Sequence, residues 1–100
     1  MNIHVLEQAE DDLVEGYRFY EDQEPGLGNY FLDCLYSDVE SLVLYAGMHR
    51  FVYKNFHRLL SKRFPFAIYY TLSDDEIEVH AIVDWRKSPT WIRDHLNNAR

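Results

Sequence analysis

The sequence predicts an α+β fold in the order β-α-α-β-β-β-α, in which an antiparallel sheet packs on a helical hairpin and a short C-terminal helix follows. Two observations carry this prediction. Apolar residues recur at helical spacing through the first half of the chain, and they alternate with polar residues at strand spacing through most of the second half. A chain of 100 residues has room for one core, so we expect a single domain spanning 1–100.

The first half predicts a short strand followed by two helices. Residues 3–6 form an apolar run typical of a strand, and the helical period begins at about Gln8. The segment 24–26, Glu-Pro-Gly, ends this helix because proline lacks an amide hydrogen and glycine permits a tight turn. A second helix is expected over 27–46, with Gly47 as its C-terminal cap. Helices joined by so short a connection lie antiparallel as a hairpin.

The second half predicts an antiparallel meander and a last helix. After an irregular stretch at 48–55, three segments read as consecutive strands joined by hairpins: 56–62, 66–72 and 76–83. Ser88 and Pro89 have the residue types that open a helix, which we expect to run from Thr90 to about Leu96. The core between hairpin and sheet is expected to contain Phe31, Leu35, Ile68 and Val79.

Composition excludes several classes of protein. Hydrophobic residues make up 47% of the chain, with four glycines and three prolines, which argues against disorder. No apolar run approaches the ~18 residues of a membrane span, and the first residues lack a secretory pattern, so we expect a cytoplasmic protein. His4 and His57 have no partner at metal-ligand spacing, and Cys34 is expected to be a buried thiol. We therefore expect neither metal nor cofactor.

The charges are divided unequally along the chain. Residues 1–49 carry eleven acidic residues and one basic residue, whereas residues 50–100 carry nine basic and six acidic residues. The net charge of -7 makes the chain a poor non-specific ligand for nucleic acid, since Lys and Arg supply most of that affinity. Direct DNA binding is not expected without a partner.

The candidate chemistry lies on one face of the predicted sheet. Successive residues of a strand point to opposite sides, so four apolar residues of the strand at 76–84 should face the helices: Ile77, Val79, Ala81 and Val83. The open face would then carry Glu78, His80, Ile82 and Asp84. Arg86 continues the same alternation, and Arg58 and Lys62 share one face of their own strand. The open face of the sheet could therefore hold one charged cluster, namely Arg58, Lys62, His80, Asp84 and Arg86.

Two functions fit this cluster, and a third interpretation needs no function. Arginine suits bidentate contact with phosphate, and His80 could act as acid or base in RNA cleavage. Alternatively, the charges only solvate one face of the sheet. Trp91 would either clamp the last helix on the sheet or stack on a nucleic-acid base.

Four segments, in order, resemble the RelE/ParE superfamily, the toxins of type II toxin–antitoxin modules long called plasmid stabilisation proteins. Ala9-Glu10-Asp11-Asp12-Leu13 is similar to the opening helix of that family, and Tyr20 with Pro25-Gly26-Leu27-Gly28 and Phe31-Leu32 to its link into the second helix. Residues 63–70, Arg-Phe-Pro-Phe-Ala-Ile-Tyr-Tyr, resemble its central strand. The last segment resembles the final strand and ending of that family: Ala81-Ile82-Val83, then Arg86-Lys87-Ser88-Pro89 and Trp91-Ile92-Arg93.

The resemblance implies a growth-inhibiting toxin that is neutralised by a cognate antitoxin encoded next to it. Its long hairpin, and the absence of a basic residue from 66–70, bring it closer to the ParE branch, which inhibits DNA gyrase. The expected function is thus inhibition of a protein target such as gyrase. The alternatives are a ribosome-dependent mRNA endoribonuclease of the RelE type, or a non-toxic relative that only binds the antitoxin. In a ribonuclease, the catalytic residues would be Arg86, Arg58, Lys62 and His80.

Overall fold

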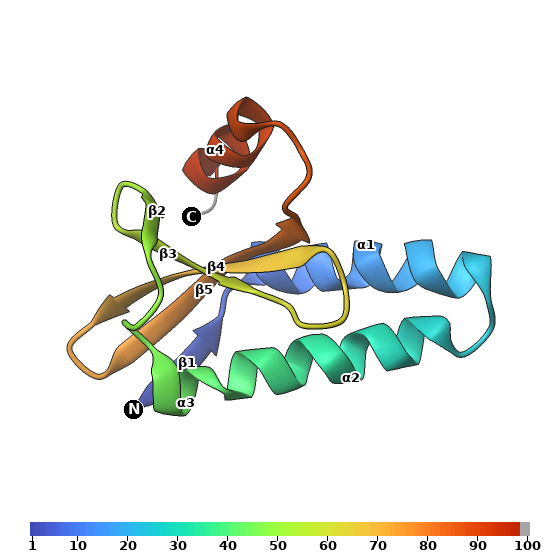
Figure 1. The fold of residues 1–100 in the computed structure, drawn as a ribbon, viewed down its shortest axis with the longest axis horizontal. Coiled ribbons are helices and arrows are strands. Elements are labelled where there is room, and N and C mark those ends of the chain that lie inside the picture. Colours follow the sequence, from blue (N-terminus) through green and yellow to red (C-terminus); the bar gives the residue numbers. More distant parts are fainter. Residues whose placement is uncertain (99–100) are drawn as a thin grey trace.

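The computed structural model describes residues 1–98 and shows a five-stranded sheet with helices on both faces (Figure 1). The elements, in chain order, are β1 (Asn2–Val5), α1 (Glu7–Gln23), α2 (Leu27–Glu40), α3 (Leu42–Tyr45), β2 (Phe51–Tyr53), β3 (Phe56–Leu60), β4 (Phe66–Ser73), β5 (Glu76–Asp84) and α4 (Pro89–Asn98). In space the strands are ordered β1-β5-β4-β3-β2.

The sheet contains the predicted meander and two further features. β3, β4 and β5 pair antiparallel in succession, as the alternation predicted. β1 pairs parallel with β5, so the sheet is mixed rather than wholly antiparallel. The helical hairpin carries the chain from β1 at one edge of the sheet to β2 at the other, and the meander then returns to place β5 beside β1. β2 adds an edge strand within 48–55, the stretch expected to be irregular. Three residues are too few to show an alternation, which is why the sequence did not reveal it.

The helical hairpin is as predicted, and its two helices come into close contact at Gly16 of α1, which has no side chain. The two helices run side by side in opposite directions along one face of the sheet (Figure 1). A Cβ atom added at Gly16 would lie 2.5 Å from the ring of Phe31, so only glycine allows this approach. At the turn, the carboxylate of Glu21 accepts hydrogen bonds from the backbone N–H groups of Gly26 and Gly28 at 3.0–3.1 Å.

The second helix is shorter than the expected 27–46. α2 ends at Glu40 and α3 is a separate turn, with Ser41 between them. The Ser41 hydroxyl donates to the carbonyl oxygen of Asp38 at 2.6 Å, a local bond of the kind that competes with helical pairing. The predicted cap is confirmed, since Gly47 has a φ of 88°, in the left-handed region that glycine favours.

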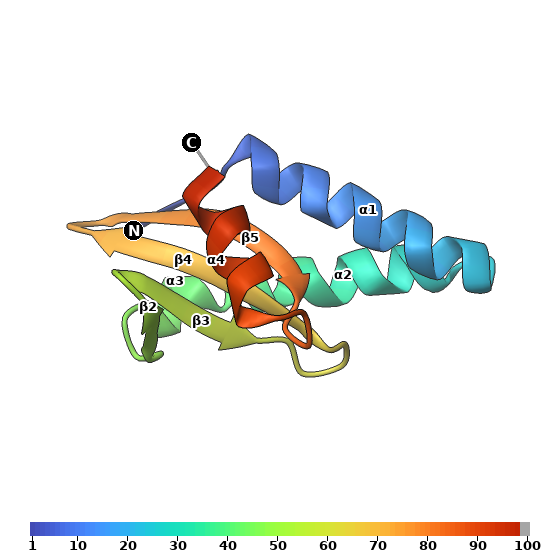
Figure 2. The ribbon, with the colours of Figure 1, turned by 90° about the horizontal axis from the view of Figure 1, so that it is seen from above.

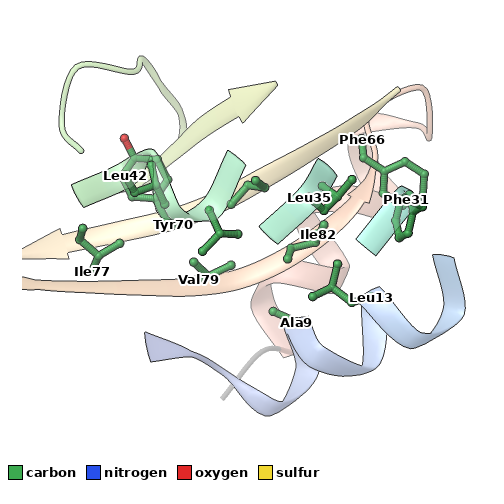
Figure 3. Close-up of a cluster of buried hydrophobic side chains, with 12 residues drawn as sticks. Ala9, Leu13, Phe31, Leu35, Leu42, Phe66, Tyr70, Ile77, Val79 and Ile82 are labelled. Atoms are coloured by element: carbon green, nitrogen blue, oxygen red, sulfur yellow. The ribbon is translucent and has the colours of Figure 1, made fainter. Parts of the chain in front are cut away.

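The main core lies between the hairpin and the sheet (Figure 3). Its buried members are Ala9, Leu13, Phe31, Leu35, Val39, Leu42, Phe66, Ile68, Tyr70, Ile77, Val79 and Ile82. Four of them are the residues that the sequence predicted there, and none of these four is exposed to solvent.

A bulge in β5 overturns part of the predicted side-chain arrangement. Tyr70 pairs with Val79 and Tyr69 with Ala81, which leaves His80 as an extra residue with no partner on β4. An inserted residue reverses the alternation beyond it. Ala81 and Val83 therefore point away from the hairpin, and Ile82 points into its core, the opposite of what strict alternation predicts.

The face expected to be open is covered by α4, which lies across it on the side opposite the hairpin (Figure 2). Leu96 is buried there against sheet residues, and Ile92 packs beside it. Ser88 caps this helix, as predicted, because its hydroxyl accepts a hydrogen bond from the N–H of Trp91 at 3.1 Å. The sheet is thus the middle layer of three.

Candidate functional site

Arg86 and Asp84 form a tight ion pair at the end of β5. The guanidinium Nη2 lies 2.7 Å from Asp84 Oδ2, and Nε lies 3.0 Å from Oδ1. The backbone N–H of Arg86 also donates to Oδ1 at 2.8 Å. The hydrogen bond from Arg86 lowers the pKa of Asp84, and the carboxylate in turn raises the pKa of Arg86. The Arg86 side chain is 63% exposed, but its positive charge is already neutralised.

His80, the bulged residue, is half-buried and electrically neutral at pH 7. Its Nε2 lies 2.9 Å from the Thr71 hydroxyl, and the edge of its ring packs on Phe56. Burial lowers its pKa from the usual 6.5. Four residues of strand separate it from Asp84, a distance of ~13 Å along the chain direction. His80 is therefore remote from the ion pair at the end of β5.

Arg58 lies on the face of the sheet that α4 covers, directly opposite Tyr69 on the neighbouring strand. Lys62 lies elsewhere. It follows the end of β3 and lines a surface hollow beside α2, together with Asp33 and Asp38. The five charged residues that were expected to form one cluster thus lie in four places, because β3 ends at Leu60 and the bulge redirects β5.

A small groove, here called the α4 groove, lies between α4 and the strands beneath it. Its volume is about 140 Å³, and its lining residues are Val52, Tyr53, Arg58, Tyr69, Trp85, Lys87, Pro89, Ile92, Arg93 and Leu96. Three of these are basic and several are aromatic. Among residues 1–98, no ion pair involves Arg58, Lys87 or Arg93. Of these residues, only Arg58 was expected from the sequence to take part in a site, since the others meet it only through the packing of α4.

A buried carboxylate that the sequence analysis missed joins three elements. Asp12 on α1 accepts a hydrogen bond from the backbone N–H of Ile82 at 3.0 Å, and His95 Nε2 on α4 lies 2.9 and 3.1 Å from its two oxygens. Gln8 adds a bond from its side-chain amide to the carbonyl oxygen of His95 at 3.0 Å. Burial is the largest influence on Asp12 and raises its pKa above 3.8. Its position on the buried face of α1, three residues after Ala9, was the available signal.

Apolar side chains gather on the surface around α3 and the edge strand β2, here called the edge surface. Leu44, Met48 and Phe51 are 76%, 77% and 62% exposed. A hollow of about 630 Å³ lies there, lined by Met48, His49, Arg50, Phe51, Val52, Arg58 and Leu60. β2 pairs with β3 only through Phe56 and His57, with one further backbone bond at Arg58. The rest of the β3 edge is accessible to an added strand.

Three other findings concern metal binding, the membrane and Trp91. No group of three or more His, Cys, Asp or Glu side chains in the described part of the chain lies close enough together to hold a metal ion. The helices described, over residues 1–98, are each too short or too polar to cross a membrane. Trp91 stacks on His95 within α4, with the Lys87 ammonium 4.3 Å from its ring centre, while Ile92 and Leu96 make the helix's contacts with the sheet.

Comparisons with known proteins identify the fold. No protein-family model matches the chain, and neither does any curated protein. Among solved structures, the chain is similar to one described as the chromosomal ParDE TA system from P. aeruginosa, with a TM-score of 0.78 and 19% sequence identity. The similarity covers 84% of this chain and 95% of that chain.

Proposed function

We propose that this chain, which has a RelE/ParE-like toxin fold, is the toxin component of a type II toxin–antitoxin module. It inhibits growth by binding a protein target such as DNA gyrase, and a cognate antitoxin encoded next to it holds it inactive. The observation that carries the proposal is the likeness to a chain of a ParDE system over most of both chains. The four segments of sequence resemblance, which run through the whole chain, support it independently.

The edge surface supports the second part of the proposal, the binding of an antitoxin. Exposed apolar side chains such as Leu44, Met48 and Phe51 lie next to the accessible edge of β3. Contiguous exposed apolar surface of this kind typically marks a site of protein association. An amphipathic antitoxin segment can bury these side chains and pair with the strand edge. Because such a contact is mainly apolar, the two chains should co-purify at high salt.

The geometry favours inhibition by binding over RNA cleavage. Cleavage without a metal needs a base, an acid and a cation around one phosphate. Here Arg86 is paired with Asp84 at the end of β5, His80 lies ~13 Å back along that strand, and Lys62 lies beside α2, so these groups do not surround a common point. A ribosome-dependent ribonuclease and a non-toxic relative are the two other outcomes of the test below.

The test combines induced expression with two readouts of the target. Purified protein should inhibit the supercoiling activity of gyrase, and mRNA ends mapped after induction should show no new cuts. New cleavage sites within codons would establish the ribonuclease instead. Unchanged growth, with no effect on gyrase or mRNA, would leave only the non-toxic relative.

A further inference from the structure

The floor of the α4 groove holds a polar group that the protein itself does not satisfy. Tyr69 is 1% exposed, and its hydroxyl hydrogen has no acceptor among residues 1–98. Buried hydroxyls are almost always hydrogen-bonded, because an unpaired one forfeits its hydration. Burial raises the pKa of Tyr69, and the Arg58 guanidinium, which can donate a hydrogen bond to the phenol oxygen, opposes this rise. The hydroxyl keeps its proton and remains free to donate it to an acceptor. A donor without an acceptor, lining a groove, indicates a missing acceptor.

The same groove concentrates positive charge. Arg58 stands half-buried next to this hydroxyl, and Lys87 and Arg93 line the groove with it. Arg93 and Lys87 are held against aromatic rings, at 5.6 Å from the centre of Tyr53 and 4.3 Å from that of Trp91. Lys87 lies near enough to Asp84 to help lower the pKa of that carboxyl, but no carboxylate among residues 1–98 forms an ion pair with Arg58 or Arg93, although the chain as a whole carries a charge of -7. The missing acceptor is therefore an anion.

The size and lining of the groove select the kind of anion. Its 140 Å³ is well below the ~300–1,000 Å³ typical of pockets for small-molecule ligands, so it takes a side chain rather than a nucleotide. Val52, Ile92 and Leu96 give it apolar walls, which suit an apolar neighbour of the anionic group. A polyanion such as RNA would be repelled by the acidic remainder of the surface, whereas a single carboxylate is repelled much less.

We propose that the α4 groove binds a Glu or Asp side chain from an acidic and apolar segment of a partner protein. Arg58 and the Tyr69 hydroxyl donate hydrogen bonds to the carboxylate, and Arg93 adds a second positive charge to the lining of the groove. A guanidinium with a second donor matches the two oxygens of a carboxylate. The inference concerns the groove itself and holds whether or not the chain is a toxin.

The test is a titration of the isotope-labelled protein, followed by NMR, with the blocked peptide acetyl-Leu-Glu-Leu-amide. Signals of Ile92 and Tyr69 should shift, while the matched peptide with Gln in place of Glu should bind at least tenfold more weakly. Arg58→Met should weaken binding by about tenfold or more, as expected for loss of a charge-assisted hydrogen bond. Arg63→Met, beside α2 and outside the groove, is the matched control and should bind like the wild type.

Tyr69→Phe keeps the ring and removes only the hydroxyl, so it tests the groove even if Arg58→Met fails to fold. It should weaken binding severalfold. Equal affinity for the Glu and Gln peptides, or no change in Tyr69→Phe, would overturn the proposal. Tighter binding of inorganic phosphate or of a ten-nucleotide oligouridylate at the same signals would also overturn it, and would assign the groove to phosphate or RNA.

Discussion

Asp12→Ala should be the most damaging polar substitution in the chain. It leaves the buried N–H of Ile82 without an acceptor, and an unsatisfied buried donor costs about 1–3 kcal/mol. It also removes the partner that ties His95, and with it α4, to α1. Because burying the Asp12 carboxylate costs free energy, its removal offsets part of this loss. The net decrease in the free energy of unfolding should be about 2–4 kcal/mol, a large share of the ~5–15 kcal/mol typical of a domain.

Urea denaturation followed by circular dichroism measures this decrease, with two matched controls. Asp12→Asn retains an oxygen that accepts from Ile82 and should lose clearly less than Asp12→Ala. Asp11→Ala changes the exposed neighbouring acid and should stay within about 0.5 kcal/mol of the wild type. An Asp12→Ala protein with an unchanged midpoint would refute the argument that Asp12 joins the three elements.

The pH dependence gives a second readout of the same residue. Burial raises the pKa of Asp12 above its ordinary 3.8, so the folded protein holds this proton more tightly than the unfolded chain. Its contribution to the free energy of unfolding therefore decreases as the pH rises from about 3.8 through the folded-state pKa. Asp12→Asn removes this decrease. Parallel stability curves for the wild type and Asp12→Asn over that range would contradict the assignment.

Three further predictions concern the core, the bulge and activity. Phe31→Ala should lower the free energy of unfolding by roughly 3–5 kcal/mol, and Val79→Ala by less, because both side chains are buried. Near-normal denaturation midpoints would contradict their place in the core. Because burial lowers the pKa of His80, the free energy of unfolding should fall as the pH drops below 6.5, and a His80→Gln protein with the same slope would refute this. Arg86→Ala should fold normally, because an exposed ion pair such as Arg86–Asp84 contributes little to stability. Since Arg86 matches the ending of the RelE/ParE superfamily, the variant should also lose growth inhibition, and equal toxicity would show that Arg86 takes no part in it.

The sequence predicted the elements whose patterns are long and unambiguous. The hairpin, the meander and the main core follow from helical and strand periods, and positions such as Phe31 and Val79 fit only one face. The bulge was hidden for a physical reason. Helices cover both faces of the sheet, so the neighbouring residues Ala81, Ile82 and Val83 are all apolar and all buried. Their sequence therefore does not reveal which of them face the hairpin and which face α4.

The candidate site was harder to predict because it depends on contacts between distant segments. The sequence shows that Arg58 could bind an anion and that His80 could act as an acid or base. Which groups lie beside them depends on the packing of α4 and on where β3 ends. Asp12 is separated by 70 residues from Ile82 and by 83 from His95. Local periodicity places such a carboxylate on a buried face and gives no information on its partners.

Growth after induced expression, with and without the product of the adjacent reading frame, tests the central proposal most directly. We predict growth arrest when this chain is expressed alone and recovery when the neighbouring protein is expressed with it. The two chains should then co-purify through a high-salt wash. Unimpaired growth during strong expression of the folded chain, or arrest that the neighbouring protein does not relieve, would contradict the proposal that this chain is a toxin held inactive by a cognate antitoxin.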